Sequence, residues 1–537
     1  MTVTGVDGSA PPLARSMAAM TALTALSRFT GFILFVVVAA VVGLGALGNT
    51  YQSANTIPNV LYELVIAGVV QAVLIPSLVA HLDRDDQLGA EHVAGAVLGL
   101  ATIALAVVAV AGAVAAPWLA RALFADGENP AVRAAQARTG TVFLWFFLPQ
   151  VVCYAAGLVA TSVLNARHRF ALPAVAPLAN NVVVLVALAG FWRLRDGSRS
   201  VRLSAAETVV LAGGTTLGVV AFCGLPVMAA RRSGFRLRPN LDHRNPEVRS
   251  LARQGAWAAV FLAATQLLLV VVLVLGNRVQ GGLIAYQLGF QFFLLPHALF
   301  ALPVLTTLFP TLSRLARSGD HAGFGATVGR GVETIAYLVV PMAVLLGALG
   351  GVVSRTVLFG QAGPAGTARV AGALAGFAPG LVGYGLFLFA SRVSYARGDT
   401  RTPALVNLVA VVAGGVVMVV ASAVVPDRHR VAALAASHSL TYLAGSVVLL
   451  RRVVRALPRA DRPALAAAVA RPVALGLALA TVLVVAVRWV HPVGRAAGTA
   501  TLAVLGAATL AAYVGLATAT GGPRPSTFVT ALRAGNP

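Results

Sequence analysis

The amino-acid sequence predicts an all-α polytopic membrane protein with about 14 transmembrane helices. Its 537 residues are 58% hydrophobic and only 11% charged, whereas soluble proteins carry about 25% charged residues. The mean hydropathy is +0.85, and long apolar runs alternate with short polar gaps along the chain. In addition, sequence features of the first half recur in the second half, as they do in many secondary transporters. We therefore expect two related halves that each cross a membrane several times.

A membrane-spanning helix needs about 20 predominantly apolar residues, and this length divides the chain into fourteen candidate helices. Pro296, Pro303 and Pro310 interrupt one of the longest runs, which can hold a kink or an interfacial stretch. The first sixteen residues are polar, and the run after them is too long for a signal peptide, so we expect a retained first helix. The candidates lie near residues 20–44, 54–80, 91–120, 140–163, 173–192, 207–230, 254–276, 282–312, 331–352, 369–391, 403–425, 431–450, 468–490 and 497–519.

The charged residues and cysteines argue against several other classes of protein. The net charge is +23 and all 40 basic residues are Arg, but these lie in short gaps between apolar runs, which disfavours nucleic-acid binding. Cys153 and Cys223 both lie inside apolar runs, so we expect no disulfide and no metal site. The glycine-rich stretches lack a P-loop lysine and the histidines lack ligand spacing. We therefore expect neither a cofactor nor enzymatic activity.

Two short basic gaps share one pattern at an offset of 230 residues. Residues 165–174 (NARHRFALPA) and 394–404 (SYARGDTRTPA) both contain Ala-Arg, five residues, and then Pro-Ala. The Arg can end one helix and the Pro can lie in the first turn of the next, where a missing N–H has no cost. Residues 75–78 (IPSL) and 309–312 (FPTL) recur at nearly the same offset. We therefore expect equivalent helix-loop-helix joints in two halves of the chain.

The arginine-rich gap 231–253 is the natural boundary between these halves, because it is the most loop-like sequence in the chain. We expect two six-helix bundles around a central cavity, followed by two additional helices. The expected divisions are an N-terminal tail at 1–16, the first bundle at 17–231, a linker at 232–253, the second bundle at 254–452, two additional transmembrane helices at 453–520 and a C-terminal tail at 521–537.

Arginine counts also predict an orientation, because positively charged loops stay in the cytoplasm. If the N-terminus is inside, the inner segments hold 25 Arg, the outer segments hold 14, and Arg28 lies within the first helix. The gaps 231–253 and 451–471, with seven and six Arg, both fall inside, whereas the outer gap 193–202 holds four. We therefore expect both termini and the linker to be cytoplasmic.

Arg28 is the first candidate for a functional residue. It lies one or two turns inside the first helix, in the run 27–32 (SRFTGF), and charged side chains inside the hydrocarbon are rare and costly. Two interpretations stay open. Arg28 can extend its side chain to the inner interface, or it can contact an anion in a cavity.

The second candidate is a polar stripe on the second helix. Gln52, Asn55, Asn59, Tyr62 and Glu63 recur at the spacing of one helical face, and such a face turns toward protein or water rather than lipid. The stripe can supply hydrogen bonds between helices or line a water-filled cavity. Glu63 favours the cavity, because a carboxylate needs water or a partner such as Arg28.

The second half offers polar candidates without an acid. Asn407 resembles Asn180 and Asn181 in its position relative to the repeated joint, and each of these side chains is as well explained by hydrogen bonding between helices. The candidates that could face a cavity are Gln266, Gln287, Gln291, Tyr384, Arg392 and Asn407.

Several of these residues together resemble the lipid II flippase family (MurJ/MviN), over about residues 15 to 520. The run 395–403 (YARGDTRTP) is the most specific of the shared motifs. The others are Ser27-Arg28 with Gly31-Phe32, Ile57 to Leu61 (IPNVL), Ile75 to Leu78 (IPSL), and Asn165 to Phe170 (NARHRF) with Pro173.

The resemblance implies a fold, a substrate and a location. It implies fourteen helices of the multidrug/oligosaccharidyl-lipid/polysaccharide exporter superfamily, with two bundles facing a central cavity and two extra helices that form a groove for the lipid tail. It also implies a bacterial plasma membrane, a lipid-linked glycan substrate, surrounding membrane lipids and contact with cell-wall synthesis proteins as partners. The chain is a divergent member, because of several cavity arginines only Arg28 is matched. The others fall on Leu34, Tyr62 and Gln291, and a family acid falls on Asn49.

Three functions remain open on the sequence. The first is a flippase that moves lipid II from the inner to the outer leaflet by alternating access, as the resemblance implies, with Arg28 on the pyrophosphate and Asn55, Asn59, Tyr62, Glu63 and Gln291 contacting the substrate. Arg suits that role because it stays charged and binds phosphate oxygens bidentately. The second is a membrane scaffold for envelope assembly that does not transport. The third is a cation-coupled exporter of small molecules or polysaccharides, in which Glu63 is the coupling carboxylate.

Overall fold

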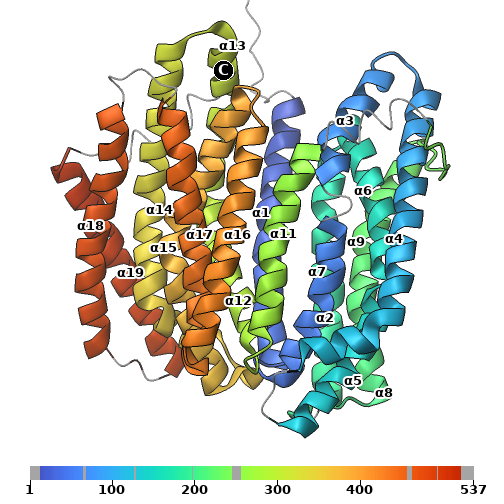
Figure 1. Cartoon of the computed structure of the whole chain (residues 1–537), viewed down its shortest axis with the longest axis horizontal. Coiled ribbons are helices and arrows are strands. Elements are labelled where there is room, and N and C mark those ends of the chain that lie inside the picture. The colour runs from blue at the N-terminus through green and yellow to red at the C-terminus, as the bar shows by residue number, and fades with distance from the viewer. Residues whose placement is uncertain are drawn as a thin grey trace, which may run out of the picture.

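The computed structural model describes residues 12–63, 68–125, 129–195, 197–244, 256–455, 462–490, 492 and 494–521. Throughout these ranges the regular structure is helical (Figure 1). Twelve helical stretches are long and apolar enough to cross a membrane, and Val260–Gly276 is a shorter apolar helix. The all-α polytopic fold is thus confirmed. The expected count of about fourteen helices is approximate, because the described residues contain twelve such stretches and one shorter apolar helix.

The first half of the chain, from α1 to α9, is called the N-terminal half below. Its helices are α1 (Pro12–Val41), α2 (Ala46–Tyr62), α3 (Gly68–Leu82), α4 (Gln87–Leu123), α5 (Pro130–Phe147), α6 (Gln150–Ala166), α7 (Ala171–Arg195), α8 (Ala205–Thr208), the π-helical turn η2 (Val209–Gly213) and α9 (Gly214–Arg232).

The second half, from α11 to α17, is called the C-terminal half. It comprises α11 (Ala256–Gly276), α12 (Gly282–Pro296), the π-helical turn η3 (His297–Ala301), α13 (Leu302–Ser318), α14 (His321–Val357), the 3₁₀ turn η4 (Gly360–Ala362), α15 (Gly363–Ala396), α16 (Arg401–Val424) and α17 (Asp427–Arg455). Two further helices follow, α18 (Arg462–Trp489) and α19 (Gly494–Ala519).

Helix boundaries differ from the predicted runs where polar residues are helical. The candidate 54–80 is two helices, α2 and α3, on either side of residues 64–67, which lie outside the described residues. The candidate 140–163 is likewise α5 and α6, which meet at Pro149. Helix α5 begins ten residues earlier than expected, because Asn129 caps it through bonds from Ala131 N and Val132 N.

The run 282–312 is interrupted at the first of its prolines. Helix α12 ends at Pro296, and the next five residues form the π-helical turn η3 before α13 begins. Pro296 lacks an N–H and its ring crowds the preceding turn, so the regular hydrogen-bond ladder is broken there. This turn places His297 on the inner side of the C-terminal half, where it is buried.

The two Ala-Arg joints have the same backbone geometry, as their shared sequence predicts. His168 and Gly398 both take a left-handed conformation, with φ of 57° and 80°, which ends a helix in a tight turn. In both joints the next N–H donates to the carbonyl five positions back, from Arg169 to Leu164 at 2.8 Å and from Asp399 to Ser394 at 3.0 Å.

The turns that follow the two IPSL and FPTL runs also match each other. Asp86 caps α4 by accepting from Gly89 N at 2.9 Å, and Asp320 caps α14 by accepting from Gly323 N at 2.8 Å. Because the same cap occurs at equivalent positions, the similarity of the halves extends through the loops.

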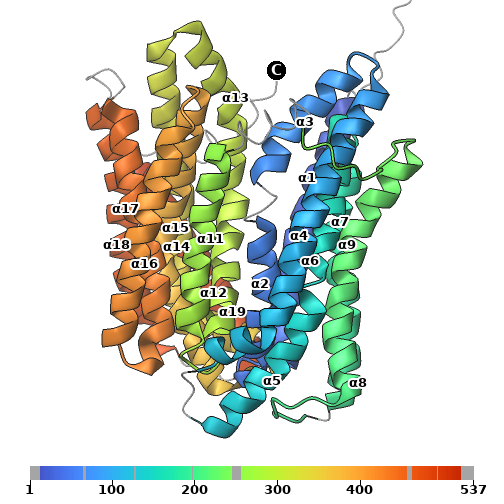
Figure 2. The same cartoon turned by 45° about the vertical axis from the view of Figure 1, so that its right-hand side comes forward.

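Both Ala-Arg joints lie at one end of the bundle. Arg167 Nη2 donates to Gln87 Oε1 at 3.3 Å, at the start of α4, and the Arg397 guanidinium lies 4.4 Å from the Phe324 ring, at the start of α14. Helices α4 and α14 start at the same end (Figures 1 and 2). This is called the joint end, and the opposite end, which carries α8 and η4, is called the α8 end.

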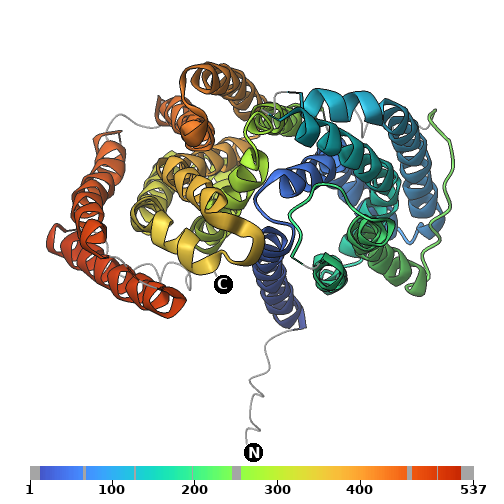
Figure 3. The ribbon, with the colours of Figure 1, turned by 90° about the horizontal axis from the view of Figure 1, so that it is seen from below.

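Each half has its own packing, and the last two helices stand outside both. Helix α15 packs closely on α17, and a Cβ on Gly380 would lie 2.4 Å from Ser439 Oγ, so only glycine permits this approach. Helices α18 and α19 pack on α14, with Tyr513 against Tyr337 and Val340. Figure 3 shows them beyond the C-terminal half, on the side away from the N-terminal half.

Candidate functional site between the two halves

Arg28 lies on α1 at the boundary between the halves. Helix α1 packs on α7 of the N-terminal half and also contacts α12, where the Phe32 and Phe292 rings meet edge to face at 4.7 Å. The Arg28 side chain is exposed and forms no hydrogen bond or ion pair with the described residues. It is close enough to act electrostatically on His297 and Tyr384. Arg28 therefore lies beside the C-terminal half, and no acid among the described residues pairs with it.

His297 is a site residue that sequence reasoning missed. It is 7% exposed, its ring lies 4.8 Å from the Tyr384 ring, and its Nδ1 has no hydrogen-bond partner in the described part of the chain. An unpaired buried polar atom carries a free-energy penalty. The signal was available, because His297 is an ionisable residue inside an apolar run, directly after Pro296.

One edge of the α2 stripe joins the halves. Gln52 Nε2 donates to Gln287 Oε1, and Gln287 Nε2 donates to Thr56 Oγ1 at 2.9 Å. A second pair of bonds reaches Asn277, from Asn49 Nδ2 at 2.5 Å and from Ser53 Oγ at 2.9 Å. All of these side chains are buried. At this edge the stripe therefore supplies hydrogen bonds between helices, and Gln52 and Gln287 do not line an open cavity between the halves.

Gln52, Asn55 and Asn59 of the stripe also line a cavity of about 130 Å³ inside the N-terminal half. Asn59 Oδ1 accepts from Tyr154 Oη at 3.0 Å, and Asn59 Nδ2 donates to Asn55 O at 3.0 Å. Tyr62 stacks at 4.6 Å on the Tyr154 ring. The remaining lining residues include Leu34, Asn180 and Thr215. This wall is polar but uncharged, and it lies within one half rather than between the two.

Glu63 follows the last residue of α2 and is half-buried. It forms no ion pair with Arg28 or with any other described residue, so the pairing considered from the sequence is absent. Its carboxylate is therefore free to meet water or a bound cation.

The remaining candidates of the second half do not form one cluster. Gln291 and Gln266 are half-buried and make no hydrogen bond to a described residue. The Arg392 guanidinium lies 5.5 Å from the Phe309 ring. Asn407 is fully buried and donates to Phe261 O at 2.9 Å on α11. Of these candidates, only Gln291 lies on α12, one turn before the segment that carries His297.

Asn407 has a counterpart that supports the repeat. The Asn181 amide on α7 pairs with Thr30 Oγ1 on α1 at 2.9 Å, as the Asn407 amide on α16 reaches Thr265 Oγ1 on α11 at 3.2 Å. Each asparagine therefore fastens the first helix of its half. Hydrogen bonding between helices explains both side chains without a substrate.

The C-terminal half has a packed aromatic interior instead of a polar cavity. Tyr286 Oη and His438 Nδ1 lie 3.0 Å apart, and the His438 ring contacts Phe377 at 5.4 Å and Tyr442 at 5.0 Å. Tyr384 packs edge to face on Tyr442 at 4.9 Å. No group of His, Cys, Asp or Glu in the described ranges could hold a metal ion.

Contacts near the α8 end close the boundary between the halves. Gln361 in η4 accepts a hydrogen bond from Arg199 Nε at 3.1 Å and donates to Gly197 O at 3.1 Å. Leu283 N donates to Asn49 Oδ1 at 3.0 Å. Among the described residues, the hydrogen bonds between the halves gather toward this end. Arg28 lies near the middle of α1 rather than one or two turns inside it, because the helix already begins at Pro12.

Comparison with protein families gives a match over most of the chain. The family model described as Lipid II flippase MurJ matches residues 38–497. A probable lipid II flippase MurJ of Rhizobium meliloti is 25% identical over 366 residues, which are 67% of this chain and 66% of that protein. The lipid II flippase MurJ of Burkholderia cenocepacia is 26% identical over 367 residues, 67% of this chain and 69% of that protein.

Solved structures show the same fold. A lipid II flippase MurJ in an inward closed conformation superposes with a TM-score of 0.73 and 17% identity, covering 93% of this chain and 98% of that chain. An inward-facing multidrug resistance transporter of the MATE family gives a TM-score of 0.63 and 12% identity, covering 83% and 98%. At these identities the likeness concerns the fold alone.

Proposed function

The chain belongs to the lipid II flippase MurJ family, and from this premise we propose that it carries lipid II across a bacterial plasma membrane by alternating access. The substrate moves from the inner to the outer leaflet while the two halves close at one end and open at the other. The fold supports this proposal, because the halves are joined at the α8 end by side-chain hydrogen bonds that can be exchanged.

The observation that carries the proposal is Arg28. It is a permanent cation in a membrane-spanning helix, it lies at the boundary between the halves, and no described acid pairs with it. An unpaired charge in this position is costly, and a pyrophosphate would supply the missing counter-charge through bidentate hydrogen bonds. Arg28 is therefore the proposed pyrophosphate contact.

Neutral side chains would contact the rest of the substrate. Asn55 and Asn59 offer amide groups on the wall of the cavity, Tyr62 offers a hydroxyl beside Tyr154, and Gln291 offers an amide on α12. Because Leu34, Asn49 and Gln291 stand where a typical member has charged residues, binding depends on one cation and on many weaker hydrogen bonds. Helices α18 and α19 would guide the lipid tail along the outside of the C-terminal half.

The joint end would face the cytoplasm, with both termini on that side. The support is the arginine asymmetry of the loops, because the arginine-rich gap 231–253 follows α9 at the joint end. Single cysteines at Gly234 and Gly522, the second outside the described residues, should resist a membrane-impermeant thiol reagent in intact cells. Labelling of both cysteines would show that the protein has the opposite orientation.

A cation-coupled exporter is the second candidate, and Glu63 is the observation that favours it. Its half-buried carboxylate forms no ion pair with a described residue, and a coupling site needs such a free carboxylate. In that case Glu63→Gln should abolish transport as completely as loss of Arg28 and remove any dependence on pH or sodium. In the flippase account, the same substitution lowers the rate only a little.

Reconstitution tests the proposed function. Purified protein in vesicles should transfer fluorescent lipid II between leaflets, measured by the fraction that an impermeant quencher reaches, and should leave a phospholipid with the same fluorophore in place. Transfer at the rate of protein-free vesicles would contradict the flippase and favour the scaffold. Depletion in cells should likewise leave lipid II on the cytoplasmic leaflet.

A further inference from the structure

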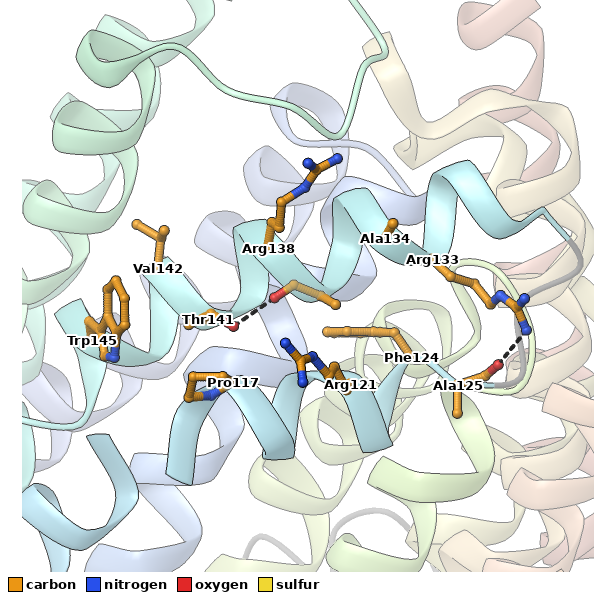
Figure 4. A pocket seen from close by; sticks show the side chains of 11 residues that line it. Pro117, Arg121, Phe124, Ala125, Arg133, Ala134, Arg138, Thr141, Val142 and Trp145 are labelled. Carbon is orange, nitrogen blue, oxygen red and sulfur yellow. Dashed lines mark hydrogen bonds between the residues drawn. The ribbon is translucent and has the colours of Figure 1, made fainter. Parts of the chain in front are cut away.

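A basic pocket of about 780 Å³ lies between the last turns of α4 and the facing side of α5, which lines it from Arg133 to Trp145. It is at the α8 end of the N-terminal half (Figures 1 and 4). Arg121 comes from α4, and Arg133 and Arg138 come from α5. The described residues that line the pocket include no acid. Three cationic residues from two helices therefore line one pocket.

The three arginines differ in how they are held. Arg133 Nη1 donates to Ala125 O at 2.9 Å, which fixes this side chain at the rim. Arg121 and Arg138 are exposed and form no hydrogen bond or ion pair with the described residues. Figure 4 shows Arg121 in the space between the two helices and Arg138 projecting from α5 on its other side. The Arg121 guanidinium is thus available to a ligand inside the pocket, and Arg138 contributes positive charge at its edge.

The pocket changes from basic to apolar along the helices. One turn before Arg121, α4 presents Pro117, and α5 continues from Arg138 to Val142 and Trp145. Trp145 Nε1 donates to Ala113 O at 3.0 Å, so the ring is held in place although its surface is 52% exposed. Tryptophan is typical of the region where lipid head groups meet acyl chains. A ligand with an anionic head and an apolar tail matches this gradient.

The length of α4 supports the same location. Its 37 residues extend about 55 Å at 1.5 Å per residue, well beyond a hydrocarbon core of about 30 Å. The end of α4 can therefore reach the head-group layer. Arginines that only extend toward the membrane interface do not have to line a common pocket. Arg121, Arg138 and the fixed Trp145 do line one pocket.

We propose that this pocket binds the phosphate head group of an anionic membrane phospholipid, with the acyl chain against Val142 and Trp145. Guanidinium groups bind phosphate oxygens in a planar fork, and each basic residue near a membrane surface strengthens binding to anionic lipid. With the orientation proposed above, this lipid belongs to the outer leaflet. Arg28 does not line this pocket, so the proposal does not depend on the role of Arg28.

Native mass spectrometry of the detergent-solubilised protein tests the proposal with phosphatidylglycerol and phosphatidylcholine of the same acyl chains. The wild-type protein should prefer phosphatidylglycerol. Arg121→Gln or Arg138→Gln should weaken this binding about fivefold, and the double variant about thirtyfold. Phosphatidylcholine binding should change little, because its choline already offsets the phosphate charge.

Arg428→Gln is the matched control, because Arg428 is an exposed arginine outside the pocket, at the start of α17, and its loss should leave phosphatidylglycerol binding unchanged. Equal binding of the two lipids by the wild-type protein would overturn the proposal. That is the result expected if Asp126 and Glu128, which lie outside the described residues, neutralise the arginines. Unchanged binding by the double variant would also overturn it. Displacement of phosphatidylglycerol by equimolar polyprenyl pyrophosphate would assign the pocket to the transported lipid instead.

Discussion

The N-terminal and C-terminal halves share their joints but differ in their interiors. Both halves end a helix with the same left-handed turn at His168 and Gly398. The N-terminal half then encloses a polar cavity beside Asn59, whereas the C-terminal half packs aromatic rings around His438. A repeated backbone can therefore carry two different functions on its inner faces.

The difference suggests a division of labour. The polar half offers hydrogen bonds to a hydrated glycan, and the aromatic half offers a firmly packed surface that Arg28 faces across the boundary. The side chains that hold the halves together, such as Gln52 and Gln287, come from both. In the flippase account these bonds must break when the α8 end opens.

Locking the α8 end should have the largest effect. In a protein with Cys153→Ala and Cys223→Ala, the pair Ser53→Cys and Asn277→Cys replaces groups that are 2.9 Å apart. A short reducible crosslinker should reduce lipid II transfer to the background rate, because the halves can no longer separate, and reductant should restore it.

The control pair is Thr30→Cys with Asn181→Cys, whose groups are 2.9 Å apart but lie within one half. Crosslinking this pair should leave transfer largely intact. Wild-type transfer by a fully crosslinked Ser53–Asn277 pair would show that the halves need not separate there.

A smaller effect should distinguish the two repeated asparagines. Asn181→Leu and Asn407→Leu should each lower the free energy of unfolding by about 1 kcal/mol, because each removes the hydrogen bonds of one amide to a neighbouring helix. Thermal unfolding should show similar losses. Only Asn181→Leu should also slow lipid II transfer, since it fastens α1, which carries Arg28. Equal transfer rates for the two variants would weaken the assignment of Arg28.

The smallest effect should come from the helix caps. Asp86→Ala and Asp320→Ala should each lower the melting temperature by about 2 °C, because each removes an N-cap. The Gly89 N–H and the His81 ring hold the pKa of Asp86 below its usual value. Its contribution is therefore present above a pH of about 4 and is lost as the pH falls further.

Melting curves at several pH values measure this contribution. The difference between the wild-type protein and Asp86→Ala should shrink in acid, and a difference that grew as the pH fell would show that the cap acts in another way.

The sequence predicted the parts of the fold that depend on local patterns. The apolar runs and the Ala-Arg joints needed only residues that are near one another in the chain. Helix α5 was partly missed because Arg133, Gln136 and Arg138 break the apolar run, although Asn129 and Pro130 are a helix start signal. Hydropathy therefore identifies the segments that cross the hydrocarbon core, but it does not show where each helix begins or ends.

The site was harder to predict because its contacts join distant segments. Helical periodicity placed Gln52 and Asn59 on one face, but it could not show that Gln52 pairs with Gln287, 235 positions away. Asn277 follows an apolar run and looked like a loop residue, yet it is 7% exposed and bonds across the boundary. Only the packing of the two halves shows which polar side chains hold helices together and which remain free.

Transfer of fluorescent lipid II by Arg28 variants in vesicles tests the central claim most directly. Arg28→Ala should reduce transfer to the rate of protein-free vesicles while the melting temperature stays close to that of the wild-type protein. Arg28→Lys should remain about tenfold below wild type, because an ammonium group cannot supply the planar fork that binds two phosphate oxygens. Full activity of Arg28→Lys would show that Arg28 only extends toward the interface, and wild-type transfer by Arg28→Ala would contradict the assignment of Arg28 to the pyrophosphate.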